Sequence, residues 1–347
     1  MSAHRQILVF AAGIAIGVSS AGALLAQAAG SPTTASTAAT CVTPPPAPVP
    51  APGSSTVHGY ATVAGTTTGG AAGPTVTVAT LAALRTEAAR SGPAVIRVSG
   101  TLTGTGDIPV TSDKTIVGVG TDAGLTGAGL KLTGIHNVIV QNLTISKVAA
   151  TSGTGDAVHI EKSDHIWIDH NTLSSDLTHG KDYYDGLIDI THAADYVTVS
   201  WNYLHDHYKA TLVGHSDSNA TQDTGHLHVT YDHNYFKNIN SRTPSLRFGT
   251  GHVYDNYFVN GDTGVHSRMG AQMLVENNVF TGVSTPIETT GDSKQDGFVN
   301  QSGNLFGTGT NKITKTGTFT RAPYVAALDP ASAVAAAVSA GAGAGHL

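Results

Sequence analysis

The stretch HNVIVQNLTI at residues 136–145 introduces a pattern that returns six more times along the chain. Each copy alternates apolar and polar residues and then carries an Asn, followed within two positions by Leu, Val or an aromatic residue. The other copies are DHIWIDHNTL (164–173), DYVTVSWNYL (195–204), HLHVTYDHNYF (226–236), GHVYDNYF (251–258), QMLVENNVF (272–280) and VNQSGNLF (299–306). Their Asn residues are 29, 31, 32, 22, 22 and 26 residues apart, and they are Asn142, Asn171, Asn202, Asn234, Asn256, Asn278 and Asn304. A unit that recurs at this period is typical of a solenoid.

The repeated unit contains strands and no convincing helix, so the predicted fold class is all-β and the solenoid is a β-helix. Successive coils of such a fold stack about 4.8 Å apart as parallel strands. An Asn at the same bend of each coil can take left-handed backbone geometry and hydrogen-bond its neighbour, which predicts a ladder of stacked Asn side chains. The alternative is a β-sandwich, but an antiparallel sandwich does not repeat one turn residue at one strand position.

The spacing of the repeats also predicts where loops are inserted. The shortest separation, 22 residues, gives the length of a minimal coil. The three longer separations, between Asn142 and Asn234, therefore predict extra loops on those coils. Functional residues often lie on loops held by a rigid scaffold, and the charged residues singled out below fall in or next to this region.

Both ends of the β-helix are expected to carry a short helix. Thr80 is a suitable N-cap for the first helix, which Gly92-Pro93 would end. For the second helix, Asp329 is the expected N-cap, with Pro330 at the first position and residues 331–338 as the helix. Helices at both ends would cover the exposed coil edges. The final AGAGAGHL (340–347) is expected to be a loose tail.

The first residues predict export and a spacer. Residues 1–28 resemble a signal peptide, with an apolar run from Ile7 to Val18 and the small-x-small site Ala26-Gln27-Ala28. Residues 29–56 are rich in Pro, Ala and Thr, a composition that favours an extended linker. The β-helix domain is then predicted over residues 57–347, secreted to the outside of the cell.

Composition limits the partners. The formal net charge is −6 and only 12% of the residues are charged, so the chain has no general attraction to nucleic acid or to anionic membranes. No segment after the signal is long and apolar enough to span a membrane. The single cysteine, Cys41, can form no intrachain disulfide. We expect a monomer with no nucleic-acid partner and no membrane partner after signal cleavage.

The residues that indicate chemistry lie between positions 185 and 247. Asp185 and Asp189 are followed by Lys209, Arg242 and Arg247. Two acids and then a basic trio suit a site that binds a hard cation together with an anionic substrate.

Two other sets of residues are weaker candidates. The 17 His residues suggest a metal, but no Cys accompanies them, and His170, His207 and His233 follow Asp residues at repeated positions. Stacked hydrogen-bonding ladders are therefore expected in place of zinc. In GHSD (214–217), Ser216 and Asp217 lack the strained turn of a hydrolase nucleophile, so no catalytic role is expected there.

Several motifs, taken in order, resemble the pectate lyases. The segments are TTTGG (66–70), WIDHNTLSS (167–175), DGLIDI (185–190), VTVSWNYLHDHYK (197–209), LVGHSD (212–217), SRTPSLRFG (241–249), HVYDNYF (252–258) and ALDPASAV (327–334). The resemblance covers roughly residues 57–345. It implies a single-stranded right-handed parallel β-helix and a secreted enzyme that cleaves α-1,4-polygalacturonate by calcium-dependent β-elimination to unsaturated oligogalacturonides.

The resemblance also implies a role for each site residue. The family's acidic Ca²⁺ ligands correspond to Asp156, Asp185 and Asp189. The residues that pair with substrate carboxylates correspond to Lys209 and Arg247, and the family's proposed Brønsted base, the catalytic residue, corresponds to Arg242.

The implied chemistry makes physical sense. Removing the proton on carbon 5, next to a carboxylate, places new negative charge beside an existing one, and Ca²⁺ would offset that charge. An arginine side chain normally keeps its proton, so Arg242 would accept the C5 proton or would stabilise the enolate while water or hydroxide accepts it. Thr154 stands where relatives often carry a further acid, which leaves the number of calcium ions open.

Three alternatives remain. A pectin lyase would act on methyl-esterified chains and would lack the calcium carboxylates. A polygalacturonase would use a carboxylic acid and a base to activate water, with no need for the Lys and Arg set. A non-catalytic polysaccharide-binding β-helix would keep the Asn ladder without converging acids and bases.

Overall fold

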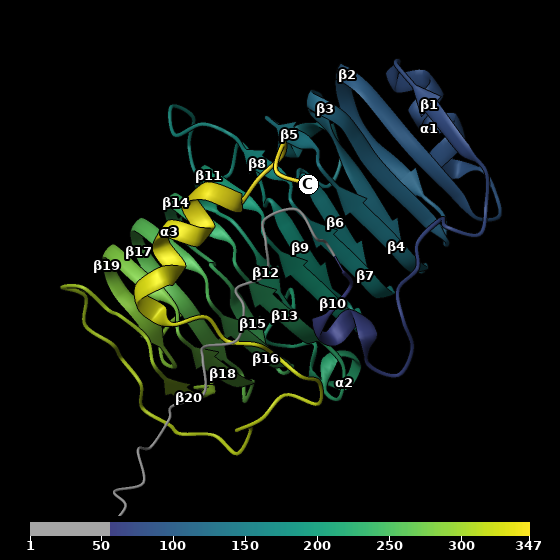
Figure 1. Ribbon diagram of the computed structural model, residues 1–347. Helices are drawn as coiled ribbons and strands as arrows, with labels where there is room; N and C mark the ends of the chain where they lie inside the picture. Colours follow the sequence, from purple (N-terminus) through teal and green to yellow (C-terminus); the bar gives the residue numbers. More distant parts are fainter. Residues whose placement is uncertain (1–55) are drawn as a thin grey trace, which may run out of the picture. The chain divides into compact units, whose positions relative to one another are not determined.

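The computed structural model describes residues 56–347. The predicted signal peptide (1–28) and all but the last residue of the predicted linker (29–56) lie outside the described residues. From there on the chain winds into coils whose strands pair in parallel with the strands of the next coil (Figure 1). The fold is a right-handed parallel β-helix, as the repeat and the resemblance predict.

The paired strands form three columns, because successive coils place their strands at the same three positions. The first coils are built by β1 (Thr75–Val78) and by two long strands, β2 (Ala94–Val110) and β3 (Lys114–Thr133), which pass through several columns. The first column continues with β4 (His136–Gln141), β7 (Asp164–Asp169), β10 (Asp195–Ser200), β13 (His228–Asp232), β16 (Thr250–Tyr254), β18 (Gln272–Glu276) and β20 (Phe298–Ser302).

The other two columns carry the remaining strands. The second column contains β5 (Thr144–Ser146), β8 (Thr172–Ser174), β11 (Tyr203–Lys209), β14 (Tyr235–Ser241), β17 (Tyr257–Arg268) and β19 (Val279–Glu288). The third column contains β6 (Val158–Glu161), β9 (Ile188–Thr191), β12 (Leu212–Val213) and β15 (Ser245–Arg247), and it continues through the last residues of β17 to the last residues of β19. Short helical turns, η1 (Gly59–Thr62), η2 (Ala150–Ser152) and α2 (Ala220–Asp223), lie outside the columns.

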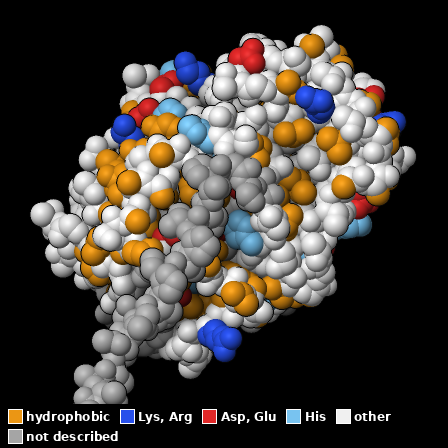
Figure 2. Space-filling view, viewed as in Figure 1, with side chains coloured by type: hydrophobic (Ala, Val, Ile, Leu, Met, Phe, Trp, Pro, Cys, Tyr) orange, Lys and Arg blue, Asp and Glu red, His pale blue; other side chains and the backbone are white. Residues whose placement is uncertain are grey.

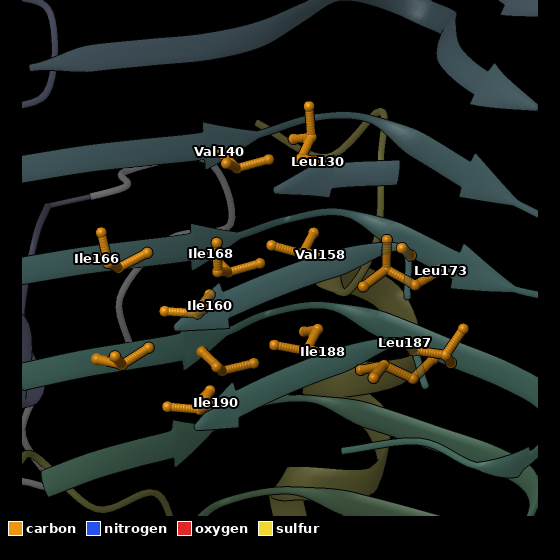
Figure 3. Packing of buried hydrophobic residues seen from close by; sticks show 14 of the residues in the cluster. Leu130, Val140, Val158, Ile160, Ile166, Ile168, Leu173, Leu187, Ile188 and Ile190 are labelled. Atoms are coloured by element: carbon orange, nitrogen blue, oxygen red, sulfur yellow. The ribbon is translucent and has the colours of Figure 1, made fainter. Parts of the chain in front are cut away.

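The core is made of like residues stacked from coil to coil. In the third column Leu130 pairs with Val158, and Val158 pairs with Ile188; all three are at most 1% exposed. Figure 3 shows these side chains pointing into the interior of the coils, beside Val140 and Ile168 of the first column. Alternation along each strand selects which residues point inward, so the apolar alternation in the repeats is the direct cause of this core.

The predicted Asn ladder is present over most of its length. From Asn171 to Asn304, each carboxamide nitrogen donates to the carboxamide oxygen of the next Asn at 2.9–3.0 Å. Asn142 is outside this ladder, since its carboxamide nitrogen donates to the backbone oxygens of Gly118 and Gly120.

The backbone geometry of the ladder differs from the prediction. At all six bends the left-handed residue is the one before the ladder Asn, and these residues are His170, Trp201, His233, Asp255, Asn277 and Gly303. Only Asn142, which is not part of the ladder, is itself left-handed, with φ of 56°. The side-chain carboxamide of the ladder Asn bonds to the adjacent coil, and the residue before it takes the left-handed conformation that makes the bend.

The N-terminal helix, α1 (Leu81–Ala89), confirms the prediction. The Thr80 hydroxyl accepts a hydrogen bond from the Ala83 amide, and Leu84 and Ala88 are fully buried against the first coils. Since α1 packs on β2, it covers the edge where the coils begin.

The C-terminal helix, α3 (Ala331–Gly341), corrects two expectations. Its N-cap is Pro330, while the carboxylate of Asp329 faces the ring of His233 at 3.5 Å. The helix also does not cover the last coil. Val334 and Val338 pack against the stacked rings of Tyr235 and Tyr257. Figure 1 shows the helix lying along the side of the coils, over β14 and β17.

The sequence predicts a loose tail after α3, but the structure shows that the tail is bound to the coils. The Gly343 amide donates to the Trp201 carbonyl at 2.8 Å, and the Gly345 amide donates to the Asn142 side-chain oxygen at 2.6 Å. A Cβ atom on Gly341 would come within 2.7 Å of the Trp201 ring. Glycine at alternate positions therefore lets the tail lie flat on several coils.

The first described residues bind to the outer side of the first column. His58 Nε2 lies 2.9 Å from the buried carboxylate of Asp232, which also contacts His233 Nδ1 at 3.0 Å. Tyr60 is 2% exposed. The contact between His58 and Asp232 joins the start of the domain to a coil 174 residues further along the chain.

The outer surface reflects the composition. On the face shown in Figure 2, charged side chains are few and are separated by wide areas of uncharged surface. None of the helices in residues 56–347 has the length and apolar character needed to cross a membrane.

Candidate functional site

The inserted loops lie where the spacing predicts them. The longest connections on the lengthened coils are residues 147–157 before β6, residues 175–187 before β9, and residues 214–227 between β12 and β13. Each of the first two brings acidic residues to the third column. The extra length therefore surrounds one part of the scaffold.

Three acids predicted to bind calcium meet at this place. One carboxylate oxygen of each of Asp156, Asp185 and Asp189 lies within 4.8 Å of the other two. Asp189 is on β9, Asp185 precedes that strand, and Asp156 precedes β6. Asp185 thus lies outside the strand. Two residues four positions apart on one extended strand would be about 13 Å apart, too far to share an ion.

Gly186 makes room for this cluster. A Cβ atom at this position would be 2.4 Å from Asp189 Oδ1 and 2.8 Å from Asp156 Oδ1. The Gly186 amide also donates to Asp156 Oδ1 at 2.7 Å. Gly186 is not among the residues with positive φ, so its lack of a side chain is what the site uses.

The electrostatics of the cluster favour a cation. Burial and then the charge of Asp156 raise the pKa of Asp189 well above its ordinary value. Burial also raises the pKa of Asp156, and this outweighs the hydrogen bond from His159 at 2.7 Å. Buried carboxylates this close together repel each other, and a divalent ion would remove that repulsion.

The donor set fits calcium. It offers carboxylate oxygens and no sulfur, which is the chemistry that Ca²⁺ prefers, and it leaves coordination positions for other oxygens. Backbone and side-chain donors hold each acid in place: Leu212 N lies 3.1 Å from Asp189 Oδ1, and Lys209 Nζ lies 2.9 Å from Asp185 Oδ1.

Thr154 stands where relatives often carry a further acid, and its polar groups bind an acid from elsewhere in the chain. Thr154 donates its hydroxyl and its backbone amide to Asp107 Oδ1, at 3.1 and 3.0 Å. Asp107 comes from β2 and also lies 3.6 Å from Lys131 Nζ. An acid from another coil therefore stands beside Thr154, although the sequence motif lacks one.

A cationic groove adjoins the acid cluster. It encloses about 360 Å³, and its lining includes the basic residues Lys181, Lys209, Arg242, Arg247 and Arg268. Lys209 joins the groove to the cluster, because its ammonium group contacts both Asp185 and Asp182 at 2.9 Å.

The predicted catalytic residue lines this groove. Arg242 has φ of +61° and precedes Thr243-Pro244. Left-handed backbone recurs at many bends of these coils, for example at Asn238 and Phe248, so this φ reflects a bend in the chain and does not by itself distinguish Arg242. The charge of Arg242 also lowers the pKa of Asp189, against the effects of burial and Asp156.

Arg247 lines the same groove but is already held by protein groups. Its Nε donates to Asp217 Oδ1 at 2.6 Å, and its Nη1 donates to the Gly214 carbonyl at 2.7 Å. The side chain is 11% exposed. The sequence prediction placed Arg247 in the groove but did not foresee these partners.

Three other residues of the site were missed by the sequence prediction, namely Lys181, His159 and Arg268. Lys181 lies in an inserted loop, and that location was the one available signal. His159 follows Asp156 by three residues and contacts it directly. Arg268 ends β17 and pairs in register with Arg247 on β15. Nothing in its local sequence distinguishes it.

The histidine prediction is confirmed in part. The rings of His170, Trp201 and His233 stack with centroid separations of 5.7 and 4.3 Å, and His170 and His233 each contact the preceding Asp. His207 is not in this stack and instead accepts a hydrogen bond from the Lys209 amide. Within residues 56–347, the three aspartates are the one His, Cys, Asp or Glu cluster with metal-binding geometry.

Comparison with known proteins finds similarity to pectate lyases, both in sequence and in structure. A family model described as pectate lyase matches residues 31–347. "Pectate lyase A" of Aspergillus niger is 44% identical over 322 residues, covering 92% of this chain and 95% of the relative. "Probable pectate lyase B" of Aspergillus flavus is 49% identical over 269 residues, covering 77% and 81%. Among solved structures, a pectate lyase from Bacillus sp. N165 in complex with trigalacturonate is 34% identical, with a TM-score of 0.77, covering 84% of this chain and 99% of the other.

Proposed function

The chain belongs to the pectate lyase family and is a polysaccharide lyase, and we propose that it cleaves α-1,4-polygalacturonate by calcium-dependent β-elimination. The observation that supports this proposal is the contact between an acid cluster and a cationic groove. Lys209 touches both, since it lines the groove and lies 2.9 Å from Asp185. A substrate with a carboxylate on every sugar fits the groove, and a hard cation fits the acids.

In this proposal the acidic residues bind the metal ion and the basic residues bind the substrate. Asp156, Asp185 and Asp189 would hold the calcium ion. When bound, the ion would supply positive charge beside the carboxylate that flanks the reacting carbon. Lys209 and Arg247 would pair with substrate carboxylates and fix the sugar chain in the groove.

Arg242 is assigned the catalytic role. It would face carbon 5, where it takes the proton or pairs with the enolate oxygens while hydroxide takes it. In both routes the C5–H electrons form the new double bond, and the glycosidic oxygen on carbon 4 leaves. The products are an oligogalacturonide with a C4=C5 double bond in the sugar at its new non-reducing end, and a second fragment whose departing oxygen takes a proton and becomes the hydroxyl group of a new reducing end.

The test uses de-esterified polygalacturonate with calcium and with a chelator. Ultraviolet absorbance from the unsaturated product, present with calcium and absent with chelator, supports the proposal. New reducing ends without absorbance would indicate hydrolysis, and binding without either signal would indicate a non-catalytic module. A preference for methyl-esterified pectin without calcium would indicate a pectin lyase. Any of these three results overturns the proposal.

We further propose that the protein is secreted, on the basis of the signal-like residues 1–28. Cleavage after Ala28 would leave a mature chain that begins at Ala29. Mass spectrometry of protein recovered from culture medium tests this directly. Intact chain retained inside the cell would refute it.

A further inference from the structure

Asp217 has no role in the function described so far, although it touches a groove residue. It belongs to the segment GHSD between β12 and α2, and its side chain is 16% exposed. Its Oδ1 accepts the 2.6 Å hydrogen bond from Arg247 Nε. Since Nε and Nη1 of Arg247 are engaged within the protein, Nη2, which has no hydrogen-bond partner among residues 56–347, can serve a ligand.

Asp217 also contacts a second loop. Ser293 Oγ donates to Asp217 Oδ1 at 2.7 Å, and the Lys294 amide donates to Asp217 Oδ2 at 2.9 Å. Ser293 Oγ in turn accepts from Arg268 Nε at 2.8 Å. Arg268 also donates from Nη1 to Ser245 Oγ at 3.2 Å and from Nη2 to the Asp292 carbonyl. The Asp217 carboxylate thus contacts Arg247 directly and Arg268 through the Ser293 hydroxyl group. The two arginines lie on adjacent coils.

The charges explain why a carboxylate is needed here. Burial lowers the pKa of Arg268, the charge of Arg247 lowers it further, and Asp217 opposes this, with a result of about 10. Burial would raise the pKa of Asp217, but the hydrogen bonds from Lys294, Ser293 and Arg247 outweigh it and lower the pKa to about 2. Asp217 is therefore ionised between two guanidinium groups that repel each other.

We propose that Asp217 is a positioning residue that holds Arg247 directly and supports Arg268 through Ser293, so that the N–H groups these arginines do not use within the protein are available to the uronate carboxylates of the substrate. The inference rests on the proposed function for the identity of the substrate. Asp217 itself touches no substrate. It fixes the two guanidinium groups in advance, so that binding does not have to pay the entropy of ordering them.

Replacement of Asp217 by Asn separates this role from simple electrostatics. If Asp217 were only a negative charge near the groove, D217N would tighten the binding of a polyanion, because the groove would become more positive. If Asp217 positions the arginines, D217N would weaken binding in spite of the gain in positive charge. The two explanations therefore predict opposite signs.

The experiment compares D217N with D122N, a control that removes the same charge from an exposed site on β3. We expect D217N to raise KM for polygalacturonate, and the dissociation constant measured by calorimetry, about ten-fold, which corresponds to one lost hydrogen bond between charged groups. We expect kcat and calcium affinity to change little. D122N should match the wild type, and D217E should recover part of the loss. Unchanged or tighter binding by D217N overturns the inference.

A double-mutant cycle shows whether Asp217 acts through Arg247. In the R247A background, D217N should cause a much smaller further loss of affinity than it causes alone. Equal losses in both backgrounds would overturn the inference. S293A, which keeps every charge, should weaken binding in the same direction, and it serves in place of D217N if that variant does not fold. If the wild type binds polygalacturonate without cleaving it, the proposed function fails while the binding data still decide the role of Asp217.

Discussion

Replacing Gly186 with Ala adds one methyl group to the middle of the acid cluster. The new Cβ would be 2.4 Å from Asp189 Oδ1 and 2.8 Å from Asp156 Oδ1, so at least one carboxylate has to move. Overpacking of this kind costs about 1–3 kcal/mol, which corresponds to a loss of about 5-fold to 150-fold in calcium affinity. The charge of the site does not change, so the effect isolates geometry.

Calorimetric titration with calcium measures this loss. Gly180 provides a matched control, because it lies in the same loop and a Cβ atom there would meet nothing within 4 Å. We expect Gly180→Ala to bind calcium as the wild type does. Calcium should also raise the unfolding temperature of the control by more than that of Gly186→Ala. Wild-type calcium affinity in Gly186→Ala would refute the placement of the ion among these three acids.

Three other predictions follow from the site and the fold. Arg242→Ala should lower kcat on polygalacturonate by about 100-fold or more, with substrate affinity largely retained, as is common when a group facing developing charge is removed; steady-state kinetics and a binding isotherm measure both. Asn256→Ala should lower the free energy of unfolding by about 2–4 kcal/mol, because buried partners on adjacent coils lose their hydrogen bonds; a denaturant titration measures it. Raising the pH from about 6.5 through about 9 should lower the free energy of unfolding. Burial lowers the pKa of His58 and His233, but Asp232 outweighs it and raises both to about 9, so their contribution is complete below the unfolded value and is lost above pH 9.

Each of these predictions has a result that contradicts it. Near-normal turnover in Arg242→Ala would remove that residue from catalysis. A loss in Asn256→Ala no larger than in Asn304→Ala, at the partly exposed end of the ladder, would mean that the buried rungs do not carry the stability. Stability that stays level up to pH 10 would show that the contact between His58 and Asp232 does not stabilise the fold, and a His58→Gln variant would then have the same pH profile as the wild type.

The fold was predictable because its cause is repeated. One Asn per coil, with apolar alternation before it, states the same packing rule seven times, and the ladder from Asn171 to Asn304 follows from it. The left-handed residues before each Asn were not predictable, since His170, Trp201 and Asp255 share no chemistry. Only their place in the coil, which depends on the stacked neighbours, gives them this geometry.

The site was predictable only as far as motifs reach. Asp185 and Asp189 are close in the chain, so their pattern suggests a cation. Asp217 and Arg247 are 30 residues apart, and nothing local links them before the coils stack. The docking of the glycine-rich tail was missed for the same reason, because its partners Trp201 and Asn142 are far away in the sequence.

Together with α3, which packs against Val279, that tail links several coils of the stack, back to the one that contains Asn142. A row of coils that touch only their neighbours is free to unravel from either terminus, one unit at a time. Here the Gly343 and Gly345 amides bind to the coils that contain Trp201 and Asn142. Fraying at the C-terminal end must first break these contacts, so the coils are expected to unfold together as one cooperative body, and trimming residues 341–347 should let them melt in stages.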